Sequence, residues 1–287
     1  MKSPISTLVL VLLTVAGTTV AGCGSNAEDN ITEPPVTQWT LQIGTEQGEG
    51  TTRALTLGGA GGYKTMTCSW AEGEKVYVYK STGGASPAMA HVGTLKAQSS
   101  GSSVTLSGTL TGVFSLSDEL FLYTQPLSNT FYSGQNGVLE KLASDYDLMY
   151  DKVIVTGVNP ETHTITTGNA IFKAMRSICR FVLKDKLGND LKPTQLTMTA
   201  VGLVTGYNNN WEPIFGSYET PSSLTFTLDG TRNVIFLSVS DFYSDTSRPK
   251  TAYTFTAKVG SDTYSCTKNA ALNNGKYYST TLSMTKQ

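Results

Sequence analysis

The sequence predicts an all-β fold, and three observations lead to this prediction. Short apolar segments recur along the chain, roughly a dozen or more, with turn residues at about 8–12-residue intervals. Several segments alternate apolar and polar residues, which is the period of a strand with one buried face. Only 15% of the residues are charged, and Gly, Ser and Thr are abundant, a composition that suits a β-rich exported surface.

The first strand is expected at residues 38–44. Trp39, Leu41 and Ile43 share one face there, and polar residues occupy the other, so the strand should be half-buried. The same reasoning predicts further strands in the first half of the chain, around residues 66–70, 76–79, 104–108 and 120–123.

One short helix should interrupt this pattern. Val138, Leu139, Leu142 and Tyr146 are spaced to share a helical face after Asn136-Gly137. In the second half, the mixed apolar stretch 170–184 is interpreted as one bent or bulged strand, Gly188-Asn189-Asp190 as a turn, and residues 196–204 as a strand.

Turn chemistry predicts the pairing of the later strands. The segments 224–228 and 234–239 flank Asp229-Gly230, which favours the primed turns of a β-hairpin. Residues 253–259 and 263–267 should form another pair, and Asn274-Gly275 should open a last strand at 276–284.

The N-terminus predicts export. Residues 1–22 combine Lys2 with a short apolar run and are interpreted as a signal peptide. They end in Val20-Ala21-Gly22-Cys23, a pattern typical of lipid attachment at Cys23. An ordinary secretory signal followed by a chance cysteine is the alternative.

The domain organisation follows from composition. Residues 23–37 are polar and contain Pro34-Pro35, which predicts a flexible tether. The folded part is divided into residues 38–165 and 166–287, although no sharp linker separates them.

Charge and cysteine usage narrow the partners. The net charge is −1 and the isoelectric point near 6.1, whereas a nucleic-acid-binding protein needs a basic face; no nucleic acid partner is expected. Cys68, Cys179 and Cys266 form an odd set. Three buried thiols are one interpretation, and one disulfide with a remaining thiol is the other.

No catalytic residue, metal site or cofactor is expected. His91 and His163 are interpreted as exposed histidines without a catalytic partner. The carboxylates of Asp145, Asp147 and Asp151 could in principle bind calcium, but they do not match a calcium-loop spacing and are interpreted as solvated residues at a helix end. An aromatic platform for carbohydrate is a further alternative.

Several short motifs resemble the fimbrillin family, the subunits of type V pili of Bacteroidales. They run through nearly the whole chain in the family's order, and the polar segment 25–30 also resembles a surface-export signal of Bacteroidetes lipoproteins. The motifs are Val20–Cys23, Thr51-Thr52-Arg53-Ala54-Leu55, Trp70–Glu74 with Val76–Tyr79, Ser144–Tyr150 and Asn274–Leu282.

The resemblance implies two transthyretin-like β-sandwich domains and a role as a structural or adhesive pilus subunit. Such subunits reach the outer membrane and cell surface as lipoproteins. A trypsin-like protease then cuts after an arginine, here between Arg53 and Ala54. The first strand leaves with the lipid anchor, and a strand from another pilus subunit fills the groove.

Elementary physics is compatible with this sequence of events. Loss of residues 38–44 would uncover the groove that held Trp39, Leu41 and Ile43, and burial of such side chains contributes roughly 1.5–3 kcal/mol each. Arg53 stands in a Gly/Thr-rich stretch that a protease could reach, although it could also be a surface arginine without a role.

Two other classes of function remain open. A monomeric, surface-anchored glycan-binding lipoprotein would expose aromatic residues around a groove, such as Trp211, which could equally be a loop residue tucked onto the sandwich. An enzyme is a third interpretation, and it lacks visible acid–base residues.

Overall fold

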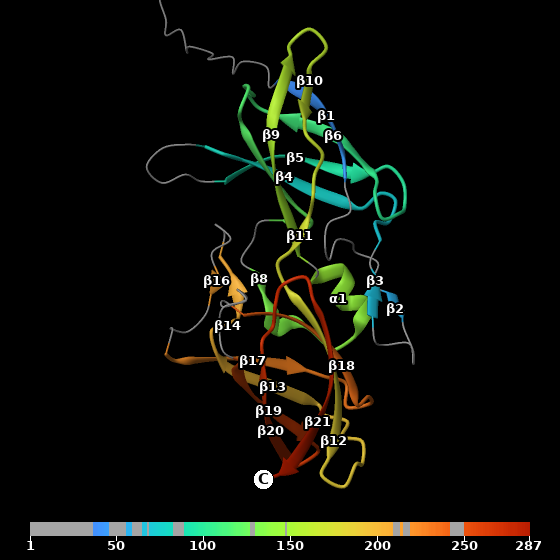
Figure 1. The fold of residues 1–287 in the computed structure, drawn as a ribbon, viewed down its shortest axis with the longest axis vertical. Coiled ribbons are helices and arrows are strands. Elements are labelled where there is room, and N and C mark those ends of the chain that lie inside the picture. Colours follow the sequence, from blue (N-terminus) through green and yellow to red (C-terminus); the bar gives the residue numbers. More distant parts are fainter. Residues whose placement is uncertain are drawn as a thin grey trace, which may run out of the picture. The chain divides into compact units, whose positions relative to one another are not determined.

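The structure is a computed structural model, and all residues that it describes belong to the compact unit Val36–Gln287. The described residues are 37–45, 56–58, 65–67, 69–82, 89–126, 130–146, 148–208, 213–214, 219–241 and 250–287. Within them the chain forms strands and one short α-helix (Figure 1). The predicted all-β fold is confirmed, with two bodies of β-sandwich or barrel character.

The first body is a sheet that closes on itself. Its strand order is β10-β1-β6-β5-β4-β7-β9-β11, and β10 also pairs with β9. The strands are β1 (Gln38–Gly44), β4 (Lys75–Ser81), β5 (Met89–Ala97), β6 (Thr105–Thr111), β7 (Glu119–Tyr123), β9 (Met149–Asn159), β10 (Thr164–Thr167) and β11 (Lys173–Ala174).

Alternation of side chains fills the interior of this closed sheet. One hydrophobic cluster takes every second residue of its main strands, including Leu41, Val78, Leu95, Leu106 and Leu122. The period-2 pattern that predicted these strands is therefore the pattern that buries them.

The second body contains eight strands in the order β14-β18-β12-β21-β20-β19-β13-β17. A second hydrophobic cluster lies between its strands. They are β12 (Ser177–Asp185), β13 (Gln195–Val201), β14 (Leu203–Val204), β17 (Pro221–Thr227), β18 (Val234–Asp241), β19 (Thr251–Val259), β20 (Asp262–Ala270) and β21 (Tyr277–Lys286).

Short elements complete the described chain. The predicted helix is confirmed as α1 (Leu139–Asp145), with Leu142 buried. The other short elements are η1 (Tyr132–Gly134) and the strands β2 (Thr56–Gly58), β3 (Thr65–Thr67), β8 (Thr130–Phe131), β15 (Gly206–Tyr207) and β16 (Pro213–Ile214). No helix among the described residues is both long and apolar enough to span a membrane.

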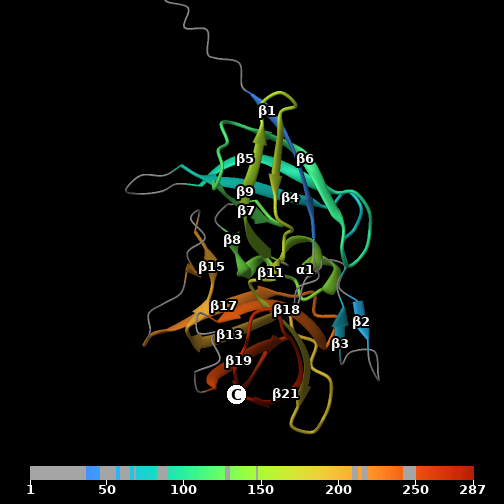
Figure 2. The same cartoon turned by 45° about the horizontal axis from the view of Figure 1, so that its top comes forward.

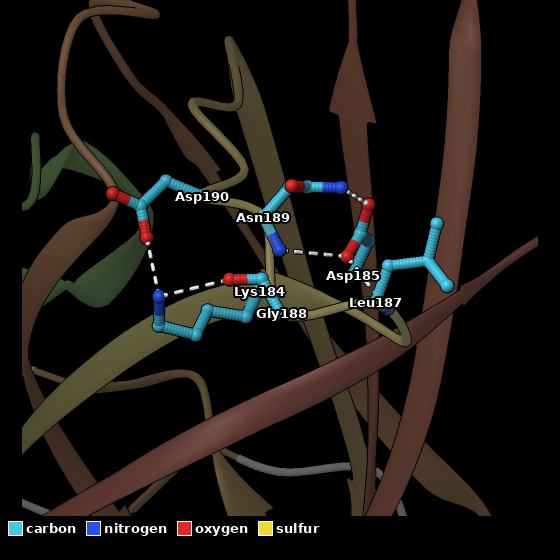
Figure 3. Close-up of polar contacts among 6 residues, drawn as sticks. All are labelled: Lys184, Asp185, Leu187, Gly188, Asn189 and Asp190. Carbon is cyan, nitrogen blue, oxygen red and sulfur yellow. Dashed lines mark hydrogen bonds and ion pairs between the residues drawn. The ribbon is translucent and has the colours of Figure 1, made fainter.

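The turn after β12 forms as its sequence predicts (Figure 3). Oδ1 of Asp185 accepts hydrogen bonds from the backbone N–H groups of Leu187 and Asn189, each at 2.8 Å. Gly188 has φ of +90°, a conformation that suits glycine. These hydrogen bonds hold the pKa of Asp185 below its usual value, with the side-chain amide of Asn189 as the largest cause.

The hairpin predicted around Asp229-Gly230 is wrong. β17 pairs with β13, whereas β18 pairs with β12 and β14. The turn residues are present, and Asp229 accepts a hydrogen bond from the N–H of Thr231 at 2.9 Å. However, β17 and β18 both direct apolar side chains into the second cluster, and they lie at distant places in the strand order rather than edge to edge.

Two other predicted strands are each divided. The stretch 170–184 contains β11 and β12, which belong to different sheets. The stretch 196–204 is broken at Gly202, whose φ is +76°. The β19–β20 hairpin and the turn at Asn274-Gly275 before the last strand are confirmed. The predicted domain boundary between residues 165 and 166 falls within β10 and stays a prediction.

Candidate functional site: the first strand and its groove

β1 is an inner strand of the closed sheet, although it is the first of the described strands along the chain (blue in Figure 2). It pairs antiparallel with β6 along its whole length, from Gln38↔Thr111 to Gly44↔Thr105. On its other side it pairs parallel with β10, at Thr40↔Thr164 and Leu41↔Ile165. Removal of β1 would therefore open the sheet between β6 and β10.

The three predicted side chains of β1 point into the core. Trp39 is 8% exposed, Leu41 0% and Ile43 1%, and all three belong to the cluster inside the first sheet. The intervening polar residues are exposed. The face predicted from the alternation is thus the buried face.

Trp39 is held by one hydrogen bond and two ring contacts. Its Nε1 donates a hydrogen bond to the carbonyl oxygen of Gly112 at 2.9 Å. Its ring meets Phe114 edge-on with centroids 6.2 Å apart, and His163 with centroids 5.7 Å apart. Partners from two different loops therefore fix this indole.

Backbone and hydroxyl contacts hold both ends of β1. The N–H of Thr40 donates to the carbonyl of His163 at 2.8 Å. At the far end, the Thr45 hydroxyl donates to the carbonyl of Val104 at 3.1 Å and accepts from the N–H of Val104 at 2.8 Å. Since Thr45 is only 6% exposed, this exchange satisfies polar groups that have little access to water.

Two glycines make room for the sheet beside β1. A Cβ atom on Gly108 would lie 2.3 Å from the carbonyl oxygen of Thr94, and one on Gly93 would lie 2.4 Å from that of Thr109. The strands β5 and β6 approach so closely there that only glycine fits without movement. The alternation that predicts a strand at residues 104–108 does not reveal this close approach.

The remaining predicted site residues fall into two groups. Cys23, Arg53, Ala54, Cys68, Asp147 and Trp211 lie outside the described residues. Cys179 and Cys266 are free cysteines. Burial raises the pKa of the Cys179 thiol to about 12 and also raises the pKa of Cys266.

The predicted histidines and carboxylates are placed as follows. His91 and His163 are both exposed; His163 also has φ of +49° and contacts Trp39. Asp145 forms an ion pair with Lys141, and Asp151 accepts a hydrogen bond from the N–H of Ile171 at 2.7 Å. Among the described residues, no group of three or more His, Cys, Asp or Glu side chains could hold a metal ion.

No protein-family model and no curated protein matches the sequence. Solved structures resemble the chain at low identity. One is of a candidate cell adhesion protein from Bacteroides uniformis, with 13% identity, TM-score 0.42 and coverage of 88% of this chain and 96% of that chain. Another candidate cell adhesion protein, from Bacteroides ovatus, has 13% identity, TM-score 0.44 and coverage of 86% and 94%.

A third solved structure is of a fimbrial assembly protein from Parabacteroides distasonis. It has 14% identity and a TM-score of 0.40, and the alignment covers 86% of this chain and 90% of that chain. These three solved structures are of cell adhesion and fimbrial assembly proteins from Bacteroides and Parabacteroides.

Proposed function

We propose that this chain is a structural or adhesive subunit of a cell-surface fimbrium, and that it polymerises by exchange of its first strand. In this proposal it is exported as a lipoprotein anchored through Cys23 to the outer membrane. A trypsin-like protease cuts between Arg53 and Ala54, β1 leaves, and a strand of another subunit fills the groove between β6 and β10.

The inner position of β1 is the observation that carries this proposal. The strand has neighbours on both sides, and Trp39, Leu41 and Ile43 are buried. At roughly 1.5–3 kcal/mol per side chain, the loss is comparable to the whole stability of a typical domain, about 5–15 kcal/mol. A cut subunit would therefore gain strongly from a replacement strand.

The groove would also recognise a strand by its backbone. Loss of β1 would free the facing edges of β6 and β10, and unpaired edges are templates for strand addition. The incoming strand would need apolar side chains at alternate positions, because the cluster fills the groove at every second residue.

Limited proteolysis tests the proposal. The chain without residues 1–22 is treated with a low dose of trypsin and analysed by N-terminal sequencing and gel filtration. We expect one early cut after Arg53, loss of β1 and a ladder of oligomers. Arg53→Gln should remain uncut at this bond and monomeric, whereas Arg232→Gln, which changes another arginine, should behave as the wild type. A cut product that stays monomeric would contradict strand exchange.

A second candidate function is a monomeric glycan-binding surface lipoprotein. A row of aromatic side chains on the first sheet favours it. Tyr79 lies 5.2 Å from His91 and 5.9 Å from Tyr123, ring centroid to ring centroid, and Tyr123 stacks with Tyr150 at 6.1 Å. Tyr79 and Tyr123 are buried. Only the exposed His91 and the half-buried Tyr150, at the two ends of the row, offer a ring to the apolar face of a sugar.

A glycan array separates the two candidates. Binding to defined glycans that is lost in Tyr150→Ala, together with an Arg53→Gln variant that assembles like the wild type, would favour the lipoprotein. Absence of glycan binding together with the trypsin-dependent ladder would favour the fimbrial subunit.

A further inference from the structure

The last two strands of the second body form a hairpin that opens toward its turn. β20 and β21 pair only at Tyr264↔Lys286 and Ser265↔Thr285. Beyond these pairs, β20 continues with β19 as far as Ala270, whereas β21 runs parallel with β12 from Tyr277 onward. A cavity of about 170 Å³ lies where the two strands separate.

The cavity has an apolar floor. Cys179, Phe181, Tyr253 and Phe255 line it, and each of them is at most 5% exposed. The rings of Phe181 and Phe255 meet edge-on with centroids 5.1 Å apart, which fixes part of the wall. An apolar cavity of about 150 Å³ is large enough to hold a benzene ring, so one ring or a short branched acyl chain fits here.

A cation lies at the mouth of the cavity. Lys268 lines the cavity and is the direct cross-strand partner of Tyr253, so the two side chains project from the same face of the sheet. Tyr253 is buried in the core, whereas Lys268 is exposed. A lysine thus stands on the core-facing side of β20, where the neighbouring residues Cys266 and Ala270 pack against the cluster.

The ammonium group of Lys268 is available to a ligand. Across the described ranges, the lysine ion pairs involve other residues, namely Lys80, Lys141, Lys152, Lys184 and Lys286. On the opposite wall, the N–H of Asn273 donates to the hydroxyl oxygen of Tyr278 at 2.9 Å, which holds that ring in place.

We infer that this cavity binds a small amphipathic carboxylate, with its apolar body against Phe181 and Phe255 and its carboxylate at Lys268. The apolar floor favours a ring or branched chain, and the unpaired ammonium selects an anionic end group over a neutral one. This inference does not depend on the exchange of β1, because the cavity lies wholly in the second body.

Calorimetry and NMR on the purified full chain in detergent test the inference with 3-phenylpropanoate as the probe and its neutral amide as the matched compound. A ligand of about eleven heavy atoms should bind with a Kd on the order of 0.1–1 mM. We expect the acid to bind about two- to fivefold more tightly than the amide, which corresponds to one ion pair with an exposed lysine. Equal affinity for acid and amide would overturn the assignment of Lys268.

Four variants complete the test. Lys268→Gln should weaken acid binding about two- to fivefold and leave amide binding unchanged. Lys258→Gln on β19 also removes one positive charge and should change neither affinity. Ala270→Leu, which places extra atoms at the cavity wall, should weaken both ligands. Lys268→Glu should exchange the preference, so that 3-phenylpropylamine binds and the acid does not.

The outcomes are decisive in each case. Retention of acid binding in Lys268→Gln, or absence of saturable chemical-shift changes at residues around Phe255, would overturn the inference. Reversed selectivity in Lys268→Glu would support it even if another variant folded poorly.

Discussion

Leu41 shows at the scale of one residue how tightly β1 fits its groove. It is fully buried and lies between Gly108 of β6 and Ile165 of β10. We expect Leu41→Ala to lower the free energy of unfolding by about 2–5 kcal/mol, because it removes apolar burial and leaves a cavity. Chemical denaturation measures this loss. Gln42→Ala is the matched control, since Gln42 is exposed on the same strand and its truncation should cost less than about 0.5 kcal/mol. Similar losses in the two variants would contradict the buried position of Leu41.

Gly108 matters because the space beside it has no room for a side chain. A Cβ atom there would lie 2.3 Å from the carbonyl oxygen of Thr94, a backbone atom that cannot turn away. Gly108→Ala should therefore destabilise the protein by about 1–3 kcal/mol through displacement of β5 from β6. Gly168→Ala is the control, since nothing lies within 4 Å of a Cβ atom at that position. An unchanged midpoint of unfolding for Gly108→Ala would show that the strands lie further apart than described.

The buried thiol of Cys179 makes the stability of the protein depend on pH in the alkaline range. Its ordinary pKa of 9.0 is raised to about 12 by burial in the folded state, so the folded protein retains a proton that the unfolded chain loses above pH 9. The contribution of this thiol is thus present below pH 9 and is lost progressively as the pH rises to about 12. We expect Cys179→Ala to be less stable than the wild type at pH 7 but to lose less stability between pH 9 and pH 11. Tyr123, whose pKa burial raises to about 12, is present in both proteins and cancels in the comparison. Parallel pH profiles would contradict the prediction.

At the scale of elements, one side chain takes the place of a strand. Gln135 follows η1 and is 2% exposed. Its Nε2 donates to the carbonyl of Ser238 at 2.7 Å, and its Oε1 accepts from the N–H of Ser238 at 2.6 Å. The side-chain amide therefore satisfies both backbone groups of a buried residue of β18, as a neighbouring strand would.

Gln135→Ala should leave both of these backbone groups without a partner. We expect a loss of roughly 2–4 kcal/mol in the free energy of unfolding, measured by chemical denaturation. The neighbouring Asn136→Ala is the control. Asn136 accepts a hydrogen bond from Val138 in an exposed position, where water can replace it, so its loss should cost less than about 1 kcal/mol.

Comparison of sequence and structure shows that local patterns predict elements better than they predict neighbours. The alternation of residues 38–44 predicted both β1 and its buried face, because that pattern is a property of the strand itself. It could not predict the parallel contact with β10, which joins residues more than one hundred positions apart. Asp229-Gly230 likewise predicted a turn but not the partners of the strands that the turn connects.

The same limit applies to the candidate sites. Trp39, Leu41 and Ile43 could be identified because their burial follows from alternation. Lys268 could not be identified from the sequence, because its position at the cavity depends on the divergence of β20 from β21. That divergence arises from the pairing of β21 with β12. In the sequence alone, Lys268 looks like any lysine on an exposed strand.

At the scale of the whole molecule, the two hydrophobic clusters predict how far local unfolding extends. Trp39, Leu41 and Ile43 belong to the cluster inside the first sheet. The second cluster contains the core of the second body together with Tyr79 and Tyr123 from the first sheet. The bodies thus have separate interiors and a limited set of shared contacts, so local opening of one should be partly independent of the other.

Hydrogen exchange on two matched variants tests this independence. Leu41→Asp places a charge in the interior of the first sheet, which is strongly unfavourable for an unpaired buried carboxylate, and should release β1. We expect amides of β6 and β10 to lose protection while those of β13 and β19 keep it. Leu237→Asp, at a fully buried position of β18, should give the opposite distribution. Uniform loss of protection in both variants would show that the two clusters unfold as one cooperative unit, and a subunit that lost β1 would then lose its second body as well.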